Sequence, residues 1–474
     1  MKKIAFIYRD ISFQAPLGMM YLSAVLKKAG YKVMLFLTEK DSTDELIRFN
    51  PDFLCYSVTT NNYKEYLDYN RKIKKRLNAM SLFGGPHATF FPEMINEDGV
   101  DGVCRGEGEE ALLEIISKID NNQDYASTKN WFLKINNNIV KNECRKLEMD
   151  IDKYPFPDRS TFFKTSKLKA SKIWILLGSR GCPFQCSYCH NHLLKTIYNN
   201  HYPVRHRSHE NILEEIQSIK EKYPVEMIIF TEDMFNLDKK WLEGFTEKYR
   251  KRLNIPYACN LRANFIDEDV ASMLKKSNCK VAYLGIESGN ENVRKNILNR
   301  YMSNKDILNA SKLLNKNNIR VVALNILGIP GTTFSEDIDT LNLNIACRPF
   351  QAVGQLLQPY PNTKIYDYSI KLNLFAEEDI PKLGDLFTDS SLRFPPDQMK
   401  KITYLRDLFP FLVQYPFLFN FFNLFLLFPR KLFYYLNKIH YGYCKFRLFP
   451  VFNSPKEFFS GLKDYYNRER RKTS

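Results

Sequence analysis

The sequence predicts an α/β protein with an N-terminal doubly wound parallel sheet, a central (βα)6 partial barrel and a mostly helical C-terminal region. Three observations support this fold class. Apolar runs alternate with amphipathic stretches over residues 1–120, six further strand–helix units follow over residues 171–370, and the alternation ends near residue 375. The expected domains are therefore residues 1–150, 151–375 and 376–474.

Length and composition agree with several domains in one folded chain. The 474 residues exceed the usual size of a single hydrophobic core. With 44% hydrophobic and 26% charged residues, the composition excludes wholesale disorder. The net charge of +16 favours anionic partners, without selecting among nucleic acid, acidic lipid and phosphorylated cofactors.

The first residues and the cysteines bear on the compartment. The apolar run Ile4–Tyr8 is too short for the core of a signal peptide, and Asp10 ends it. We therefore expect a cytoplasmic protein, in which thiols stay reduced. Of the ten cysteines, seven are scattered singly and are expected to act as small buried hydrophobes.

The N-terminal sheet is expected to carry a ligand site at the carboxyl ends of its strands, where the loops of such sheets gather. The expected strands are Ile4–Tyr8, Val33–Leu37, Phe53–Val58, Ser81–Phe83 and Gly102–Cys104. The loops after the last three read Ser57-Val58-Thr59-Thr60, Gly84-Gly85-Pro86-His87 and Gly106-Glu107-Gly108-Glu109. Each glycine alone is explained by a tight turn, whereas together they allow backbone to approach a bulky ligand closely.

The order of a Ser-Val-Thr loop and a Gly-Gly loop on consecutive strands resembles the Rossmann-like cobalamin-binding domain. The resemblance implies that Ser57, Thr59, Gly84 and Gly85 line the slot for the nucleotide tail of cobalamin. It also implies that the cofactor lies against the loops at this sheet edge.

One motif of that family is missing. An Asp-x-His-x-x-Gly sequence should follow the first strand, but residues 9–13 read Arg-Asp-Ile-Ser-Phe and contain no histidine. We therefore expect either cobalamin without a protein histidine on the lower face of cobalt, or no cobalamin. His87 follows a different strand, and we interpret it as a loop residue that contacts the corrin.

Three cysteines are clustered in the sequence Cys182-Pro183-Phe184-Gln185-Cys186-Ser187-Tyr188-Cys189, on a loop that leaves an expected strand. Three thiolates at this spacing can reach three irons of a cubane cluster and leave the fourth iron open. A zinc site with His190 as fourth ligand is the alternative. It is disfavoured because adjacent residues rarely reach one tetrahedral ion without strain.

This loop resembles the cluster loop of the radical S-adenosylmethionine superfamily. The resemblance implies a 4Fe-4S cluster with Cys182, Cys186 and Cys189 as ligands, S-adenosylmethionine on the open iron, and Tyr188 beside the adenine. In that family one electron from the cluster cleaves S-adenosylmethionine to a 5′-deoxyadenosyl radical. A reductant such as flavodoxin or ferredoxin is then an expected partner.

Polar residues follow the expected strands of the barrel, where active sites of this fold lie. The strands are Ile173–Leu177, Met227–Phe230, Tyr257–Asn260, Val281–Ile286, Val321–Leu327 and Ala352–Leu357. Glu287 with Ser288 is expected to bind the amine or ribose of S-adenosylmethionine, Arg262 its carboxylate, and Glu232 the ribose or the substrate. The alternative is that these residues cap the following helices.

The C-terminal region contains an uncharged segment rich in Phe and Leu. Leu408–Pro429 is preceded by Arg406 and followed by Arg430 and Lys431. Its length could span a bilayer, but its prolines suit short broken helices better. A segment at the interface of an anionic membrane and a buried helical cap over the barrel mouth remain equal alternatives.

Together the two resemblances indicate a cobalamin-dependent radical S-adenosylmethionine enzyme. The implied reaction is methyl transfer to an unactivated carbon of a small-molecule or lipid-like substrate, with radical cyclisation, rearrangement or methylthiolation as alternatives. A cluster-bearing binding or regulatory protein is a further alternative. Nucleic acid is not an expected partner, because no RNP-like pattern appears and no dense basic helix precedes the C-terminus. A peripheral position at the inner face of the membrane is the alternative to a purely cytoplasmic one.

Overall fold

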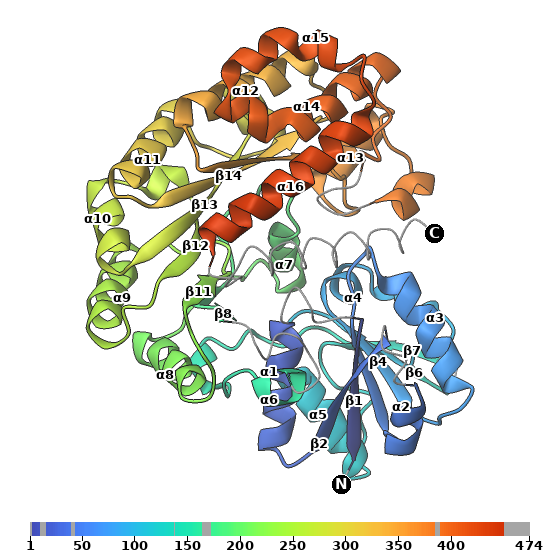
Figure 1. Cartoon of the computed structure of the whole chain (residues 1–474). Helices are drawn as coiled ribbons and strands as arrows, with labels where there is room; N and C mark the ends of the chain where they lie inside the picture. Colours follow the sequence, from blue (N-terminus) through green and yellow to red (C-terminus); the bar gives the residue numbers. More distant parts are fainter. Residues whose placement is uncertain are drawn as a thin grey trace. The chain divides into compact units, whose positions relative to one another are not determined.

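The computed structural model of the chain (Figure 1) divides by its contacts into two compact units. The first comprises residues 1–170 and 191–207, and the second comprises residues 171–190 and 208–474. The domain boundaries expected near residues 150 and 375 remain predictions. The structure describes residues 2–9, 16–38, 43–136, 138–163, 172–383 and 389–449. Most of the missing Asp-x-His-x-x-Gly position, residues 10–13, lies outside these ranges.

The first unit is built on a seven-stranded sheet in the order β2-β1-β3-β4-β5-β6-β7. The pairs among β1 to β5 are parallel, which confirms the predicted doubly wound sheet, and β6 and β7 extend it with antiparallel pairs. The strands are β1 (Lys3–Tyr8), β2 (Lys32–Leu37), β3 (Phe53–Ser57), β4 (Met80–Gly84), β5 (Gly102–Cys104), β6 (Trp131–Ile135) and β7 (Asn138–Lys141).

Helices connect the parallel strands of this unit and bury their apolar faces on the sheet. Tyr56 and Phe83, on neighbouring strands, stack with ring centroids 4.4 Å apart in the core. The helices are α1 (Leu17–Lys28), α2 (Thr43–Phe49), α3 (Tyr63–Lys74), α4 (Pro86–Phe90), α5 (Glu109–Asp120), α6 (Arg159–Phe163) and α7 (Asn191–Ile197). Shorter elements are η2 (Pro92–Asn96), η3 (Ile151–Lys153) and β10 (Arg205–His206).

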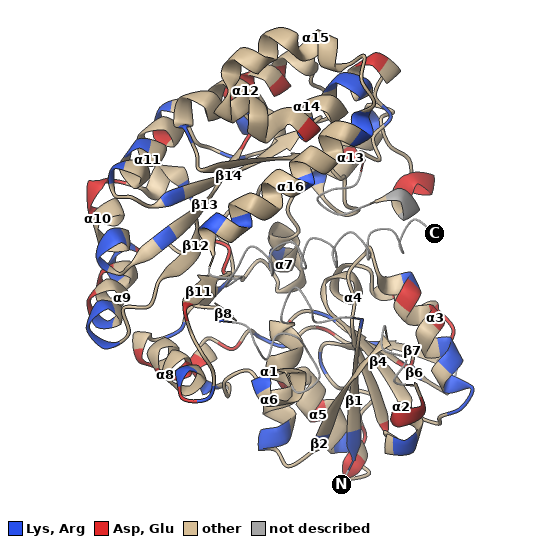
Figure 2. Ribbon diagram, in the orientation of Figure 1, with Lys and Arg blue, Asp and Glu red and all other residues tan. Residues whose placement is uncertain are grey.

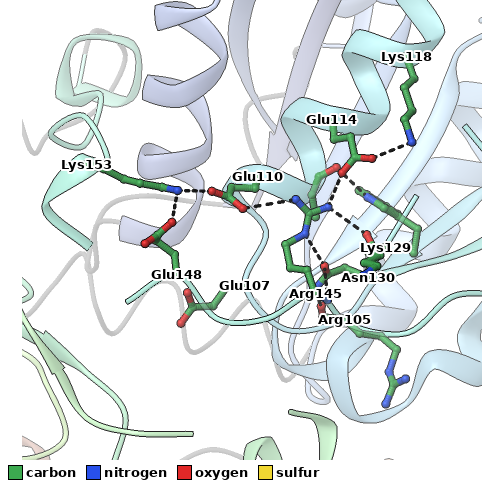
Figure 3. A network of polar contacts seen from close by, with 12 residues as sticks. Arg105, Glu107, Glu110, Glu114, Lys118, Lys129, Asn130, Arg145, Glu148 and Lys153 are labelled. Carbon is green, nitrogen blue, oxygen red and sulfur yellow. Dashed lines mark hydrogen bonds and ion pairs between the residues drawn. The ribbon is translucent and has the colours of Figure 1, made fainter. Parts of the chain in front are cut away.

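The hairpin of β6 and β7 lies within residues 121–170, a stretch in which the sequence predicts no strand. Trp131 is buried, and its indole N–H donates to the carbonyl of Ala111 at 2.9 Å, so the hairpin belongs to the core. Ion pairs hold the segment that follows: Arg145 lies 2.8 Å from Glu114, and Lys153 pairs with Glu110 (Figure 3).

The second unit contains a six-stranded parallel sheet in the order β15-β14-β13-β12-β11-β8. This is the chain order, as a (βα)6 partial barrel requires, and all six predicted strands are confirmed. They are β8 (Ile173–Leu176), β11 (Met227–Phe230), β12 (Tyr257–Leu261), β13 (Cys279–Glu287), β14 (Arg320–Leu327) and β15 (Gln351–Leu356); the short β9 (Ser179–Arg180) follows β8.

The helices of the barrel share a local signal at their starts. Each of α8 to α13 begins after a Ser, Thr or Asp whose side chain accepts a backbone N–H of the first turn. They are α8 (His209–Lys220), α9 (Lys239–Arg252), α10 (Glu268–Lys276), α11 (Asn304–Lys316), α12 (Phe334–Cys347) and α13 (Lys364–Lys371). The 3-10 helix η5 (Ala263–Phe265) and the π-helix η6 (Val293–Ile297) lie between them.

The C-terminal region consists of helices, as expected: η7 (Glu377–Lys382), α14 (Pro396–Gln414), η8 (Pro416–Phe421), α15 (Phe422–Phe425) and α16 (Arg430–Leu448). Contrary to the expected break, α14 continues through Pro410. Proline has no N–H to donate to the carbonyl of Arg406, and the side-chain amide of Asn437 on α16 donates to it instead, at 3.2 Å. Among the described residues, no helix is long and apolar enough to cross a membrane.

These helices pack along β15 and against other strands of the same sheet. Ile402, early in α14, lies near Gly328 at the carboxyl end of β14, and Phe409, later in α14, lies against Gly354 of β15. At the end of α16, Leu448 and Phe449 join an apolar cluster with first residues of the strands, including Met227. A buried cap was one of the two alternatives for Leu408–Pro429. Within this segment the structure buries Leu408, Phe409, Leu412, Val413 and Phe422 and exposes Phe417, Leu424 and Leu427.

Candidate functional site

The loop that carries the three clustered cysteines is held by backbone and side-chain hydrogen bonds to the turn after η6. The Ser187 N–H donates to the carbonyl of Leu298 at 3.0 Å, and its hydroxyl donates to the carbonyl of Ile297 at 2.6 Å. The Asn299 amide donates to the carbonyl of Gln185 at 2.6 Å. These contacts fix the middle of the loop independently of any bound group.

Arg300, at the end of this turn, connects the cysteine loop to β13. One guanidinium nitrogen lies 3.9 Å from Cys186 Sγ, and another donates to the carbonyl of Gly285 at 2.7 Å. The guanidinium also lies 3.8 Å from the Glu287 carboxylate. A Cβ at Gly285 would lie 2.8 Å from the same guanidinium, so a side chain there would displace the Arg300 guanidinium from this position. Arg300 was not predicted, because its place depends on this tertiary contact and on no local motif.

The chemistry of the donor set fits an iron–sulfur cluster. Cys186 is buried, while Cys182 and Cys189 are half-buried on the same loop. Burial raises the pKa of the Cys182 thiol, whereas the backbone N–H of Phe184 and the charge of Arg262 oppose that rise. The guanidinium groups of Arg262 and Arg300 place positive charge beside the loop, which suits the thiolate ligands that such clusters require.

The zinc alternative depends on His190. One ring nitrogen of His190, Nε2, lies 3.1 Å from the carbonyl oxygen of Pro361, so this nitrogen is engaged by the backbone. In the described part of the chain, no group of three or more His, Cys, Asp or Glu side chains is arranged to hold a single metal ion.

Glu287 ends β13 in a strained backbone conformation. Its φ of +68° is in the left-handed region, and the pairing of β13 with β14 shifts register between Gly285 and Glu287. The carboxylate forms a hydrogen bond with the Tyr188 side chain, and burial raises its pKa although Arg300 opposes this rise. Glu287 does not cap a helix, and strain at such a position is typical of a functional site.

Arg262 follows β12 and stacks on an aromatic ring of the cysteine loop. Its guanidinium carbon lies 3.7 Å from the ring centroid of Phe184. The side chain is buried, donates to Asn264 at 3.0 Å, and has a hydrogen bond with Cys186. Burial and the nearby charge of Arg300 lower the pKa of Arg262.

The remaining strand-end residues lie outside this group. Glu232 accepts the backbone N–H of Gly178 at 3.2 Å, which ties the end of β11 to the start of the cysteine loop. Ser288 is buried, and its hydroxyl accepts the Asn290 N–H at 3.3 Å within a turn. Of the predicted residues of this unit, the structure thus brings Tyr188, Arg262 and Glu287 together near the cysteines.

In the first unit, the loops after β3 and β4 interlock. The Val58 N–H donates to the carbonyl of Gly84 at 2.9 Å, and the His87 N–H donates to the carbonyl of Val58 at 3.0 Å. Gly85 has a φ of +92°, and a Cβ there would lie 2.8 Å from the hydroxyl of Ser57. One edge of the sheet, at the carboxyl ends of β3 and β4, therefore carries Ser57, Gly84 and Gly85 together with the exposed Thr59. A common ligand slot requires such an arrangement.

The glycine-rich loop after β5 joins the same edge. The Gly106 N–H donates to the Thr89 hydroxyl at 3.1 Å, which connects it to α4. Tyr198 lies against Gly106, where a Cβ would clash with its hydroxyl, and that hydroxyl accepts the Glu107 N–H at 2.7 Å. The buried Arg205 pairs with Glu107, so residues 191–207 are fixed to this loop.

His87 lies in α4 and is buried, which corrects the expectation of a loop residue. Its ring is stacked between Tyr63, at 3.9 Å between centroids, and Phe91, at 4.8 Å. Its Nδ1 lies 3.3 Å from the hydroxyl of Thr60. Burial lowers the pKa of His87 to about 4, so the imidazole is neutral near pH 7.

Comparison with known families agrees with the sites described in the two units. The Radical SAM superfamily matches residues 176–343, and the B12 binding domain matches residues 12–116. The chain therefore contains a radical S-adenosylmethionine domain and a B12-binding domain. It is an enzyme, and its cofactors are a 4Fe-4S cluster, S-adenosylmethionine and cobalamin.

Relatives of this radical S-adenosylmethionine enzyme match most of its length. An uncharacterized methyltransferase of Pyrococcus horikoshii is 27% identical over 82% of this chain and 85% of its own. The anaerobic magnesium-protoporphyrin IX monomethyl ester cyclase of Rubrivivax gelatinosus is 23% identical over 74% of this chain and 65% of its own. The fold is similar to that of the radical S-adenosylmethionine methyltransferase TsrM of Kitasatospora setae, with a TM-score of 0.65 and 16% identity over 77% and 75% of the two chains.

We predict that Cys182, Cys186 and Cys189 hold the cluster, so that replacing all three by Ala abolishes it. Iron, sulfide and the visible absorption of the protein are measured after anaerobic reconstitution. The matched control is Cys144→Ala, because Cys144 is a half-buried thiol of the first unit and lies outside the clustered sequence Cys182–Cys189. Full iron and sulfide content in the triple variant would contradict the assignment.

We also predict that Glu287→Gln weakens S-adenosylmethionine binding and leaves the cluster spectrum unchanged. Loss of one charge-assisted hydrogen bond costs about 1.5–3 kcal/mol, roughly ten- to a hundredfold in Kd. The control Glu268→Gln removes a carboxylate that is 81% exposed on α10 and should not change the Kd. An unchanged Kd in Glu287→Gln would limit Glu287 to positioning Tyr188 and Arg300.

Proposed function

We propose that this enzyme transfers a methyl group to an unactivated carbon of a small-molecule or lipid-like substrate. The observation that carries the proposal is the presence in one chain of a B12-binding domain and a radical S-adenosylmethionine domain. A relative named as a methyltransferase and a similar fold in a solved methyltransferase support the choice of reaction.

The proposed ligands of each cofactor follow from the contacts described above. Cys182, Cys186 and Cys189 would hold the cluster. Tyr188, Arg262, Glu287 and Arg300 would surround S-adenosylmethionine. Ser57, Thr59, Gly84, Gly85 and His87 would line the cobalamin site. When bound, these cofactors supply a 5′-deoxyadenosyl radical and a transferable methyl group, with electrons from a reductant such as flavodoxin or ferredoxin.

The charged residues near the cysteines have complementary roles in this proposal. The Arg300 and Arg262 guanidinium groups carry two positive charges beside the loop, which suits a ligand with a carboxylate. The Glu287 carboxylate would accept a hydrogen bond from the amino group of the same ligand. Glu232 would act by positioning, because it holds the Gly178 backbone before the cysteine loop, and Ser288 by shaping the turn after β13.

Radical cyclisation is the second candidate function. It is favoured by one observation, the similarity to a relative named as a cyclase. Both reactions require the same radical, so they differ in the fate of the methyl group of S-adenosylmethionine. A cyclase needs no methyl transfer and forms no S-adenosylhomocysteine.

The proposal predicts two products from S-adenosylmethionine. The protein is reconstituted anaerobically with iron, sulfide, cobalamin and a reductant, and the products are separated by chromatography. Methyl transfer should give both 5′-deoxyadenosine and S-adenosylhomocysteine, and the variant without the three clustered cysteines should give no 5′-deoxyadenosine. Formation of 5′-deoxyadenosine alone would favour cyclisation or rearrangement, and formation of neither product would contradict the proposal.

A further prediction concerns the lower face of cobalt. Cobalamin should bind without a protein histidine, because residues 9–13 contain none and the His87 ring is stacked between two aromatic rings. Electron paramagnetic resonance of the cob(II)alamin form in uniformly ¹⁵N-labelled protein tests this. A protein nitrogen on cobalt splits the lines into doublets, whereas the cofactor's own nitrogen gives triplets. A doublet that disappears in His87→Ala would contradict the prediction.

A further inference from the structure

Exposed apolar side chains are concentrated in the C-terminal region of the second unit. Among the described residues, 18 large hydrophobic side chains are exposed, and 11 of them lie between residues 415 and 443. We call these 11 the C-terminal apolar surface: Tyr415, Phe417, Phe421, Leu424, Leu427, Phe428, Leu432, Tyr435, Leu436, Ile439 and Tyr443. A concentration of this kind marks an interaction site more often than scattered single residues do.

Helix α16 contributes an apolar stripe on its outer side. Leu432, Tyr435, Leu436, Ile439 and Tyr443 follow one another at helical spacing and are 42–53% exposed. The inner side of the helix is also apolar and is buried at Phe433, Cys444 and Leu448. A surface helix normally has one apolar side, so the outer stripe of α16 calls for a second apolar environment.

A groove adjoins this surface at Tyr443. The groove has a volume of about 800 Å³ and is lined by Pro416, next to Tyr415 and Phe417, and by Tyr443 of α16. The charged residues in its lining are Arg348 and Arg447, together with the titratable His440, and no carboxylate lines it. The groove is therefore amphipathic and favours an anionic group beside apolar chains.

The charge pattern along the segment has the same sign. Residues 408–449 contain no Asp or Glu, and in Figure 2 the ribbon of α16 carries blue segments and no red ones. Arg406 and Arg430 pair with Asp407, so they are not the basic residues that a ligand would meet. The exposed basic residues are Lys431, Lys445 and Arg447.

We propose that the C-terminal apolar surface docks on an anionic phospholipid bilayer. Its aromatic and aliphatic side chains would enter the interface between headgroups and acyl chains, and the basic residues would contact lipid phosphates. A second copy of the chain is the less suitable occupant, because it would bring like charges of a protein with net charge +16 against each other. The inference does not depend on the reaction that the enzyme catalyses.

The test is sedimentation of the full-length protein with vesicles of equal parts phosphatidylcholine and phosphatidylglycerol, without S-adenosylmethionine or substrate. We expect the protein to pellet with these vesicles, and less with pure phosphatidylcholine. Raising the salt concentration should weaken binding but not abolish it, because salt screens the basic residues and leaves apolar insertion. Full-length protein that stays in the supernatant at low salt would overturn the proposal.

Substitutions on the stripe identify the surface. The double variant Leu432→Glu and Ile439→Glu should bind these vesicles at least about tenfold more weakly, because it loses apolar contacts and adds repulsion from anionic lipid. The matched control is Leu308→Glu with Leu372→Glu, two hydrophobic residues of the same unit that are each 37% exposed. Equal binding by wild type and the stripe variant would overturn the proposal.

Measurements without vesicles control for misfolding of the variants and for self-association. Circular dichroism and the iron content after reconstitution should be unchanged in both variants, since the substituted side chains are exposed. The oligomeric state, measured by light scattering, distinguishes the other occupant. A wild-type dimer that becomes monomeric in the stripe variant, without vesicle binding by either, would assign the surface to a second copy and overturn the bilayer proposal.

Discussion

The arrangement of the central site depends on the guanidinium group of Arg300, because it joins the cysteine loop to β13. It reaches Cys186 Sγ at 3.9 Å and the carbonyl of Gly285 at 2.7 Å with different nitrogens. A guanidinium can hold two acceptors in this way since its donors are fixed in a planar fork, which lysine lacks. Gly285 contributes to this arrangement, because a side chain at this position would collide with the guanidinium.

Burial of so much positive charge requires compensation. Arg262 and Arg300 lie close enough for the charge of Arg300 to lower the pKa of Arg262. The opposing groups are the Tyr188 side chain, the Glu287 carboxylate and the Cys186 thiol, and they raise the pKa of Arg300 despite its burial. Cysteine thiolates on a cluster and a ligand carboxylate would complete the balance. Two buried guanidinium groups with one carboxylate beside them thus leave positive charge that an anionic ligand would balance.

The sequence allowed the fold to be predicted closely, because strands, glycine turns and helix caps are local signals. All five parallel strands of the first sheet and all six of the second were predicted. The short hairpin of β6 and β7 was missed, since its burial depends on Trp131 reaching α5. The helix through Pro410 was missed for a similar reason, because Asn437 satisfies the carbonyl that proline leaves free. Arg300 likewise has no local signal.

The same tertiary contacts determine how α16 presents its outer side. Its first residue, Arg430, pairs with Asp407 at 2.9 Å, Asn437 in its middle donates to α14, and Leu448 at its end is buried among the strands of the barrel. A helix fixed at three points along one side cannot rotate to bury its other side. The exposed stripe is therefore a preformed surface, and a partner that covers it loses little conformational entropy to ordering of the helix. Helix α16 thus keeps apolar side chains in contact with water, which is unfavourable. A partner that removes this apolar surface from water therefore gains free energy on docking.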